Sequence, residues 1–550
     1  MNNASGTTLF ENLTDQYSYL DYKPAMHSMV KDRLIPGWVP NEDRRRLKSY
    51  MMMAGYVRNK GRRWLSTEVD QETEHARREY GDAATIIDTV FASLIGDTQK
   101  IWVEGAISEF DPDPDAVAQL DELEDWAEKE NFIMKMVECE RDALTLGDGI
   151  YVLGWDGEKE RPRLRVYDPG FYFPVYNEDD DSEYPRTAHI AYEFNRIIGD
   201  EEITFLRRIS YRMEYLSEPR QYPWNDRPSF DAVYMTDGEW RLEDVKNEVG
   251  LLNEAKGTFR VKDLDLQIDF IPIIHMTNNI AGKEWFGTST LARCMQILDD
   301  LASTDTDLQA ASATTGTPPI AIGGVGLGMG DNNQLETYGP GTLLRTGDGS
   351  ATLIDTSNSL DALLKYDDHL LSRLSVNSRI PESLLGRVKP SEVPSGIALT
   401  LSFTPHAALI KEMRLCRDPK YKLLFKFVSR FFQASGQLVS IAPSRLVFGS
   451  FLPADRQEAS TLVTQLYRPD KPIVSLETAV ELLVQSGFPI EDAAQEVIRI
   501  TQEDFSTANQ MLDATGDVTL VRDRLGLGSA PTGDAIPVPI EDTLALGEAT

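Results

Sequence analysis

The sequence predicts an α+β protein, and two blocks of the chain carry that prediction. Between Leu146 and about residue 265, apolar and polar residues alternate in segments separated by turns, which indicates antiparallel strands. From residue 286 to residue 436, amphipathic helices flank a glycine-rich insert and a polar loop. The chain has 550 residues, enough for about three or four domains, and 41% of them are hydrophobic.

Composition narrows the functional classes. The net charge of −33 argues against a protein that reads a nucleic-acid sequence, because neutralising phosphates requires clustered lysines and arginines. Two interpretations of the acidity stay open. It keeps a protein soluble, and it also suits the wall of a DNA conduit, which must repel phosphates for a duplex to slide.

The chain lacks the signals of membrane insertion and of secretion. No run approaches the roughly 18–20 apolar residues of a membrane span. The start, MNNASGTTLFENLTDQ, has neither the basic nor the apolar part of a secretory signal. Cys139, Cys294 and Cys416 are widely separated, which favours a reducing compartment and core positions over metal binding.

Residues 1–40 are polar and aromatic, and we expect an extended N-terminal arm there. The next part, residues 41–285, should combine helices with an antiparallel sheet. Its first stretch, Asn41 to Tyr80, is basic and aromatic. Such a stretch could meet nucleic acid or an acidic neighbour, but a solvated or inter-subunit helix face is the favoured interpretation.

Helices are expected before the first strands. Residues 84–97 have apolar side chains at helical spacing and predict a core helix. The acids that begin at Asp111 match four positions of a calcium loop, but two prolines interrupt it and Ala116 replaces its required glycine. We therefore predict that Asp115 caps an acidic helix reaching about Leu146, with no metal bound.

The region from residue 286 to residue 380 predicts two helices split by an insert. The first helix, 286–312, carries leucines on one stripe and acids, including Asp299 and Asp300, on the opposite one. The insert, 313–356, is rich in glycine and resembles short strands and turns. It has neither a GxGxxG register nor a Lys-Ser/Thr pair, so no phosphate-binding loop is predicted. Residues 357–380 form the second helix.

The last third of the chain begins with a polar region, residues 381–400. A long helix and a returning strand are expected over 401–451. Thr404 and Pro405 are predicted as the cap and first residue of the helix, and Pro419 should kink or divide it. Further helices are expected over 452–512, one of them capped by Ser475. The glycine-, proline- and acid-rich tail, 513–550, is expected to be mobile.

The sequence offers no signature of an enzyme. It contains no HExxH, CxxC, GxSxG or Walker A motif, and its six histidines are scattered singly. His275 lies in an apolar strand and is interpreted as a core residue with a satisfied hydrogen bond. We therefore expect no catalytic residues, no cofactor and no metal.

Several local patterns, taken in order, resemble the portal proteins of tailed bacteriophages. TLGDGIYVLGWD and RVYDPGFYFPVYN are similar to that family's wing hairpin. IPIIHMTN and FGTSTL resemble the lead-in to its first stem helix, and IPESLLG followed by PSGIALTL resembles the segment that spans its tunnel loop. IVSLETAVELL matches its crown pattern. Each motif is degenerate alone, and their joint order across about residues 41–510 carries the resemblance.

The resemblance implies a portal-like subunit that assembles as a ring of about twelve copies. The parts would be an α/β wing (41–285), a two-helix stem (286–312 and 357–380), a small β-rich clip (313–356), a tunnel loop (381–400), a long helix with a returning wing strand (401–451) and a helical crown (452–512). Such a ring is a channel at one capsid vertex, through which double-stranded DNA is packaged and ejected.

The resemblance also implies partners and a location. The DNA would be held without sequence specificity, and the ring would dock the terminase large subunit and later a head-completion or adaptor protein. It would also contact major capsid and scaffolding proteins. The protein would be part of the virion, at the portal vertex, after assembly in the host cytoplasm, and no membrane is involved. The ATPase chemistry belongs to the motor, in agreement with the missing P-loop.

The residues expected to meet DNA are those of the tunnel loop. Arg387 and Lys389 are the only cations between Arg379 and Lys411, and rings of such cations give weak, register-free contacts to phosphates. The acids Asp299, Asp300, Asp367 and Asp368 would line the channel or face neighbouring subunits. An ordinary surface loop is the alternative. The full loop set is Gly386, Arg387, Val388, Lys389, Pro390, Ser391, Glu392, Val393, Pro394, Ser395 and Gly396.

Two other functions remain alternatives. Another symmetric ring of the head–tail or tail region would form rings without depending on terminase. A hydrolase or nuclease with an unrecognised site would show metal-dependent turnover. The helix–insert–helix–loop order argues against the first, and the lack of a compact carboxylate or histidine group argues against the second.

Overall fold

The computed structural model divides the chain into two compact units, residues 1–452 and 453–550. The structure describes residues 35–59, 78–106, 112–176, 184–199, 201–279, 285–316, 320–323, 343–346, 351–353, 357–387, 396–451, 456–467, 473–485, 488, 490, 493 and 496–501. Three predicted segments lie outside these ranges: the N-terminal arm to residue 34, residues 388–395 of the loop, and the tail. Within these ranges no helix is long and apolar enough to span a membrane.

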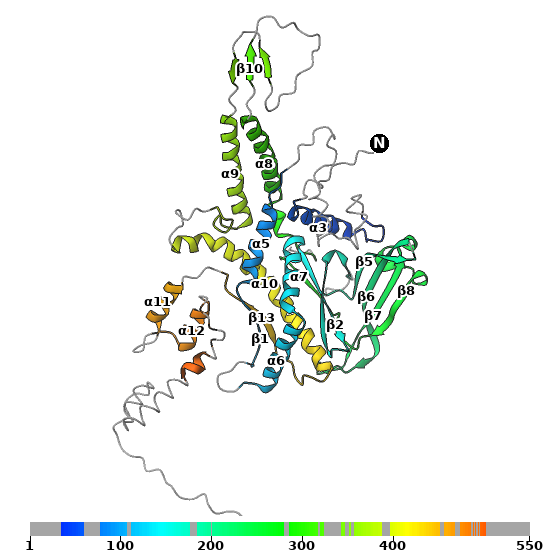
Figure 1. Ribbon diagram of the computed structural model, residues 1–550. Helices are drawn as coiled ribbons and strands as arrows, with labels where there is room; N and C mark the ends of the chain where they lie inside the picture. The colour runs from blue at the N-terminus through cyan, green and yellow to red at the C-terminus, as the bar shows by residue number, and fades with distance from the viewer. Residues whose placement is uncertain are drawn as a thin grey trace, which may run out of the picture. The chain divides into compact units, whose positions relative to one another are not determined.

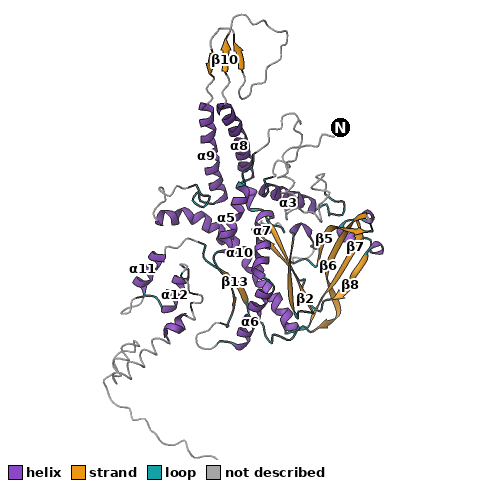
Figure 2. Ribbon diagram, viewed as in Figure 1, coloured by secondary structure: helices purple, strands orange, loops and turns teal. Residues whose placement is uncertain are grey.

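The first unit mixes helices with sheets that are antiparallel except for the β10–β11 pair, so the expected α+β class is confirmed (Figure 2). Its largest sheet has five antiparallel strands in sequence order. They are β4 (Tyr172–Val175), β5 (Thr187–Ile198), β6 (Glu201–Arg220), β7 (Ser229–Arg241) and β8 (Thr258–Asp265). A 3-10 turn, η1 (Pro169–Phe171), precedes β4. Three more lie between β7 and β8: η2 (Leu242–Asp244), η3 (Val249–Leu251) and η4 (Glu254–Lys256).

A second sheet has the order β3-β2-β9, with β2 (Asp148–Asp156), β3 (Arg161–Tyr167) and β9 (Ile273–Thr277). The strand predictions for this region are confirmed. The Asp-Pro-Gly turn after β3 is a 3-10 turn whose cap, Asp168, accepts a hydrogen bond from the Gly170 amide at 2.7 Å. Buried aromatic and aliphatic side chains of β2, among them Tyr151 and Leu153, pack in the same core as Tyr421 and Phe425.

Two helices stand where one acidic helix was predicted, so that prediction was wrong in its bounds. Helix α6 (Pro114–Lys129) is capped by Asp113, whose carboxylate accepts from the Asp115 amide at 3.1 Å. The cap therefore precedes the expected Asp115, with Pro114 as first residue. Asn131 has φ of +52°, which ends the helical run before α7 (Phe132–Leu146) begins.

Helices α3 (Asp43–Val57) and α5 (Asp82–Ile95) lie near α7 and the stem helices (Figure 1). The aromatic and sulfur side chains of α3 face inward, since Tyr50, Met51 and Met53 are buried. A two-stranded antiparallel sheet pairs β1 (Gln99–Val103) with β13 (Ser444–Phe448), two segments far apart in the sequence.

The stem region contains the expected pair of helices. A 3-10 turn, η5 (Thr290–Arg293), begins at Ser289, whose hydroxyl accepts from the Leu291 amide at 3.2 Å. Helix α8 (Met295–Gly316) follows, and α9 (Ser357–Ser378) returns. A three-stranded sheet lies at the far end of the pair (Figure 1): β10 (Ile320–Gly323), β11 (Leu343–Thr346) and β12 (Ala351–Leu353).

Helix α10 (Gly396–Ala434) has 39 residues and should measure about 58 Å at 1.5 Å per residue. It begins eight residues before the predicted cap at Thr404, so Pro405 lies inside the helix and that prediction was wrong. Pro419 is also inside and does not divide it. Within the second unit, α11 (Arg456–Leu466) and α12 (Leu476–Gln485) are described, and Ser475 caps α12 by accepting from the Thr478 amide at 3.2 Å.

Candidate functional site

The stem hairpin, defined as α8 and α9, is held together at its root by apolar side chains. Leu298 and Leu301 from α8 and Leu370 and Leu374 from α9 are buried in one cluster. That cluster also contains apolar residues of α5, including Val90. The root of the hairpin therefore belongs to the core of the first unit, and its amphipathic pattern is what places it there.

The acids predicted to line a channel divide into two groups in the structure. Asp299 accepts a hydrogen bond from the Tyr56 hydroxyl at 2.6 Å and so faces α3. Asp300, its neighbour, is half-buried on α8. Asp367 and Asp368 lie on α9, and Asp368 is exposed. That these acids line a channel stays a prediction.

Three carboxyls gather at the root of the stem hairpin. Burial raises the pKa of Asp305 to about 6, with further contributions from the negative charges of Asp367 and Asp82. Burial first, then Asp368, also raises the pKa of Asp367, while Arg387 opposes that shift. The pKa of Asp82 is raised by burial as well. Burial of these carboxylates, and second to it the repulsion between them, therefore weakens this root at neutral pH.

The loop predicted to meet DNA, residues 386–396, begins with residues that are hydrogen-bonded to the stem hairpin and its following turn. Gly386 adopts φ of +75°, a conformation that favours glycine. The next residue, Arg387, donates to Asp368 at 2.7 Å from Nη2, and its amide donates to the Glu382 carbonyl at 3.0 Å. Val388 to Ser395, including Lys389, lie outside the described residues, and Gly396 starts α10. The described loop cation thus compensates a stem acid.

Two sequence motifs meet at the segment between β9 and η5, which we call the stem lead-in. Gly147 follows α7 and Gly287 precedes η5, and the two backbones are in close contact. A Cβ atom added to Gly287 would lie 2.2 Å from the Gly147 carbonyl oxygen. The same carbonyl accepts a hydrogen bond from the Asn278 amide at 2.8 Å. Only glycine allows this approach, which explains the first glycine of GDG and the glycine of FGTSTL.

Asp148 is fully buried beside this contact, and its carboxylate has polar partners in three other elements. Its carboxylate accepts from the Gly287 amide at 2.8 Å and from the Tyr50 hydroxyl of α3. His275 Nε2 lies 2.7 Å from the same carboxylate, which confirms the expected satisfied histidine. One side chain therefore joins α3, β9 and the stem lead-in.

A second buried polar cluster, centred on Arg417 of α10, joins this helix to the stem lead-in and α7. Arg417 and Glu140 form an ion pair at 2.6 Å, and both side chains are fully buried. Arg417 also donates to the backbone carbonyl and side-chain oxygen of Asn278, each at 3.0 Å. Tyr421 donates to Glu140 at 2.8 Å. Asn278 in turn donates to the Thr288 carbonyl at 3.0 Å.

We name this arrangement the stem joint, and define it as Glu140, Asp148, Asn278, Gly287 and Arg417 together with the partners given above. It connects α7, β2, β9, the stem lead-in and α10. Such a network positions elements with respect to one another, and its low-dielectric setting makes each unmade bond costly. In the described ranges no group of three or more His, Cys, Asp or Glu could hold a metal ion.

Sequence reasoning missed the stem joint. Its hydrogen-bonded members are up to 281 residues apart, as Tyr421 and Glu140 show. The only signal in the sequence was a pair of glycine motifs, Gly147-Asp148-Gly149 and Gly287-Thr-Ser-Thr. Glycines are unusual inside strands and helices and often mark a close approach of two backbones. Arg417 and Glu140 resemble ordinary helix-surface charges in sequence.

Comparison with known proteins gives limited information. No family model matches the chain, and no curated protein matches it. Among solved structures, the chain resembles the neck of an empty GTA particle computed with C6 symmetry, at 11% identity and a TM-score of 0.40, over 74% of this chain and 91% of that one. A resemblance at that level carries no weight for function.

Proposed function

We propose that the chain is a portal subunit of a tailed bacteriophage or a related particle, a component of the virion's head–tail region. In this proposal about twelve copies form a ring whose channel carries double-stranded DNA during packaging and ejection. The observation that carries the proposal is the stem hairpin with a small sheet at its far end, followed directly by a polar loop and a 39-residue helix.

The stem hairpin has the surface of an element that needs neighbours. On α9, Leu364 and Tyr366 are each 49% exposed and Val376 is 70% exposed. These three side chains lie at different angles around α9, and covering them with a neighbouring subunit would gain about 25 cal/mol for each Å² of apolar area removed from water. A ring of such hairpins covers one flank of each with the next subunit.

The charge of the chain fits a conduit. A duplex carries one negative charge per about 1.7 Å, so an acidic wall would keep it from adhering, and the net charge of −33 argues against tight binding of DNA. The few cations of the loop, Arg387 and Lys389, would give weak contacts on such a wall. Because Arg387 already pairs with Asp368, Lys389 is the stronger candidate for contact with phosphate.

In this proposal the stem joint would transmit force from the loop to the rest of the subunit. Force on the loop would reach α10, whose Arg417 is bound to the strand that leads into α8. Asp148 would pass that force to the sheet and to α3. The insert at the far end of the hairpin would dock the terminase motor and later a head-completion protein. The motor, not this chain, would hydrolyse ATP.

Particles assembled without this chain test the proposal against its nearest alternative. A portal is needed for packaging, so the expected result is capsids that contain no DNA. Heads filled with DNA but lacking tails would contradict the proposal and would favour another ring of the head–tail region. Electron microscopy and the amount of nuclease-resistant DNA per capsid distinguish these outcomes.

A further inference from the structure

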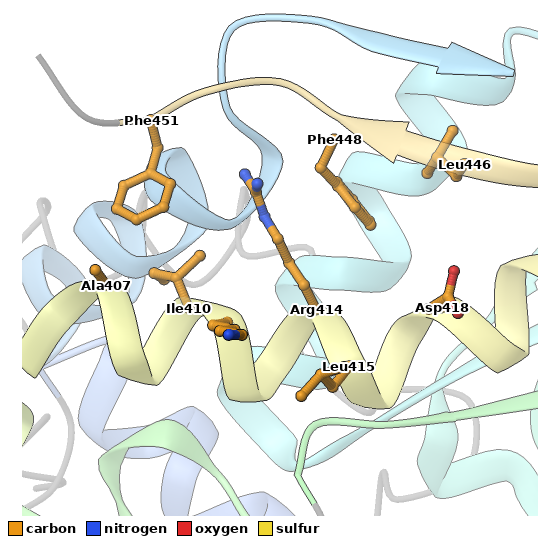
Figure 3. A pocket seen from close by; sticks show the side chains of 9 residues that line it. Ala407, Ile410, Arg414, Leu415, Asp418, Leu446, Phe448 and Phe451 are labelled. Atoms are coloured by element: carbon orange, nitrogen blue, oxygen red, sulfur yellow. The ribbon is translucent and has the colours of Figure 1, made fainter. Parts of the chain in front are cut away.

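A groove lies between α10 and the strand that returns beside it (Figure 3). We call it the α10–β13 groove and define it by Ile410, Arg414, Phe448 and Phe451, with Lys411 and Leu415 at its rim. Its volume is about 320 Å³, and most of its lining is apolar. The groove therefore has room for apolar side chains of another segment.

The groove carries a positive charge that no described carboxylate compensates. The Arg414 guanidinium donates to three backbone carbonyls, those of Leu94 at 3.0 Å, Ser93 at 3.2 Å and Gly449 at 2.9 Å. Burial lowers its pKa to about 10, as expected of a desolvated cation without an anionic partner. Figure 3 shows its side chain rising from α10 between Phe448 and Phe451.

The rim of the groove repeats this combination of charge and apolar surface. Lys411 is exposed and forms no ion pair with a described residue. Leu415, one helical turn further, is 64% exposed. Asp418, the acid of the lining, is bound by Lys422 at 2.6 Å. The groove therefore suits a segment that brings an apolar side chain next to a carboxylate.

We propose that the α10–β13 groove is a contact between subunits, occupied by an acidic and apolar segment of a second copy of this chain. The proposal rests on the ring proposed above and names one of its interfaces. A ring needs heterologous contacts, in which two different and complementary patches of the same chain meet. A second copy of this chain, with its net charge of −33, offers many surface carboxylates that could meet the cations of the groove.

The first test changes only the exposed rim, so that folding is preserved. The variant Lys411→Glu with Leu415→Asp reverses one charge and replaces an exposed apolar side chain by an acid. We expect the concentration at which half of the protein is in rings, measured by mass photometry, to rise at least tenfold. The matched control is Lys159→Glu with Leu251→Asp, the same chemical changes at exposed positions outside the groove, and it should assemble like the wild type.

Each outcome of this test has a definite meaning. A rim variant that forms rings as readily as the control overturns the groove assignment and leaves the proposed function standing. A wild-type protein that forms no ring at any concentration, even when co-expressed with capsid and scaffolding proteins, contradicts both. Equal thermal melting of the rim variant and the control, measured on monomers, shows that loss of rings reflects the contact and not unfolding.

The second test identifies the occupant. A photo-crosslinking amino acid is placed at position 415, and unlabelled and ¹⁵N-labelled chains are mixed before assembly. Crosslinked peptides that combine both labels demonstrate a second copy in the groove. Crosslinks confined to one label show that the groove is covered by its own chain, and that result overturns the proposal.

Discussion

The stem joint and the stem hairpin are adjacent, yet they differ in how far their side chains find partners within the chain. In the joint, Arg417, Glu140 and Asp148 are fully buried and each has several partners within the chain. In the hairpin, like-charged carboxyls crowd together and apolar side chains of α9 reach solvent. The joint is complete in a single chain, whereas in the proposed ring the hairpin is the part that a neighbouring subunit would complete.

The largest expected effect comes from breaking the joint. Glu140→Ala leaves the Arg417 guanidinium buried without its carboxylate, and removing one partner of a buried pair typically costs about 3–5 kcal/mol. Urea unfolding should show a loss of that size. The control is Lys129→Ala, which removes the exposed pair with Asp125 and should cost less than about 1 kcal/mol. Equal losses in the two variants would contradict the account of the joint.

A second change probes the close contact of the two glycines. Gly287→Ala places a methyl group against the Gly147 carbonyl, and overpacking of this kind costs about 1–3 kcal/mol. Gly154→Ala, where an added Cβ meets nothing within 4 Å, is the matched control. Thermal melting of both variants measures the difference. A Gly287→Ala protein as stable as the control would show that the lead-in is not held at this distance.

The acids of the hairpin root predict a smaller, pH-dependent effect. Because the folded pKa of Asp305 is about 6, above its ordinary value of 3.8, its contribution to stability is present below pH 3.8 and is lost as pH rises through 6. Protection of α8 amides, corrected for intrinsic exchange, should therefore increase from pH 7 to pH 5. Solvent screening limits the effect to less than about 1 kcal/mol.

Asp305→Asn is the variant that sharpens this prediction. It removes the titrating carboxyl while keeping its size, so the increase in α8 protection between pH 7 and pH 5 should shrink. An unchanged pH dependence would assign the effect to other groups of the root, Asp82 and Asp367 among them.

The smallest effect on stability is expected from the loop cations. Arg387→Ala with Lys389→Ala removes a partly exposed ion pair with Asp368, worth between 0 and about 1 kcal/mol, and leaves ring assembly intact. If the loop meets DNA, packaging or ejection should nevertheless decline. Titre and packaged-DNA length measure this, with Lys262→Ala on the wing sheet as the control, and unchanged values would contradict the loop assignment.

Regular elements were predictable from the sequence because their signals are local. Alternation around the Asp-Pro-Gly turn predicted the strands, and Ser475 predicted the start of α12. Two boundaries were missed for physical reasons. Asn131 enters the left-handed region and breaks the helix that the acids suggested. Pro405 resembles a first residue, but the helix starts earlier and accommodates it.

The joint and the pairing of Arg387 were beyond prediction, since both depend on tertiary contacts. Nothing near Arg417 indicates that its partners are Glu140 and Asn278, which come from other helices and strands. Likewise, a cation in a polar loop gives no sign that it will bind Asp368 of the preceding helix. Long-range ion pairs of this kind leave no periodic pattern in a sequence.

The native mass and image of the purified wild-type chain test the central claim most directly. The account predicts rings with a central hole and a mass of roughly 740 kDa, about twelve copies of the 61.7 kDa chain, by mass photometry and negative-stain microscopy. A chain that stays at 61.7 kDa, even when co-expressed with capsid and scaffolding proteins, would contradict it.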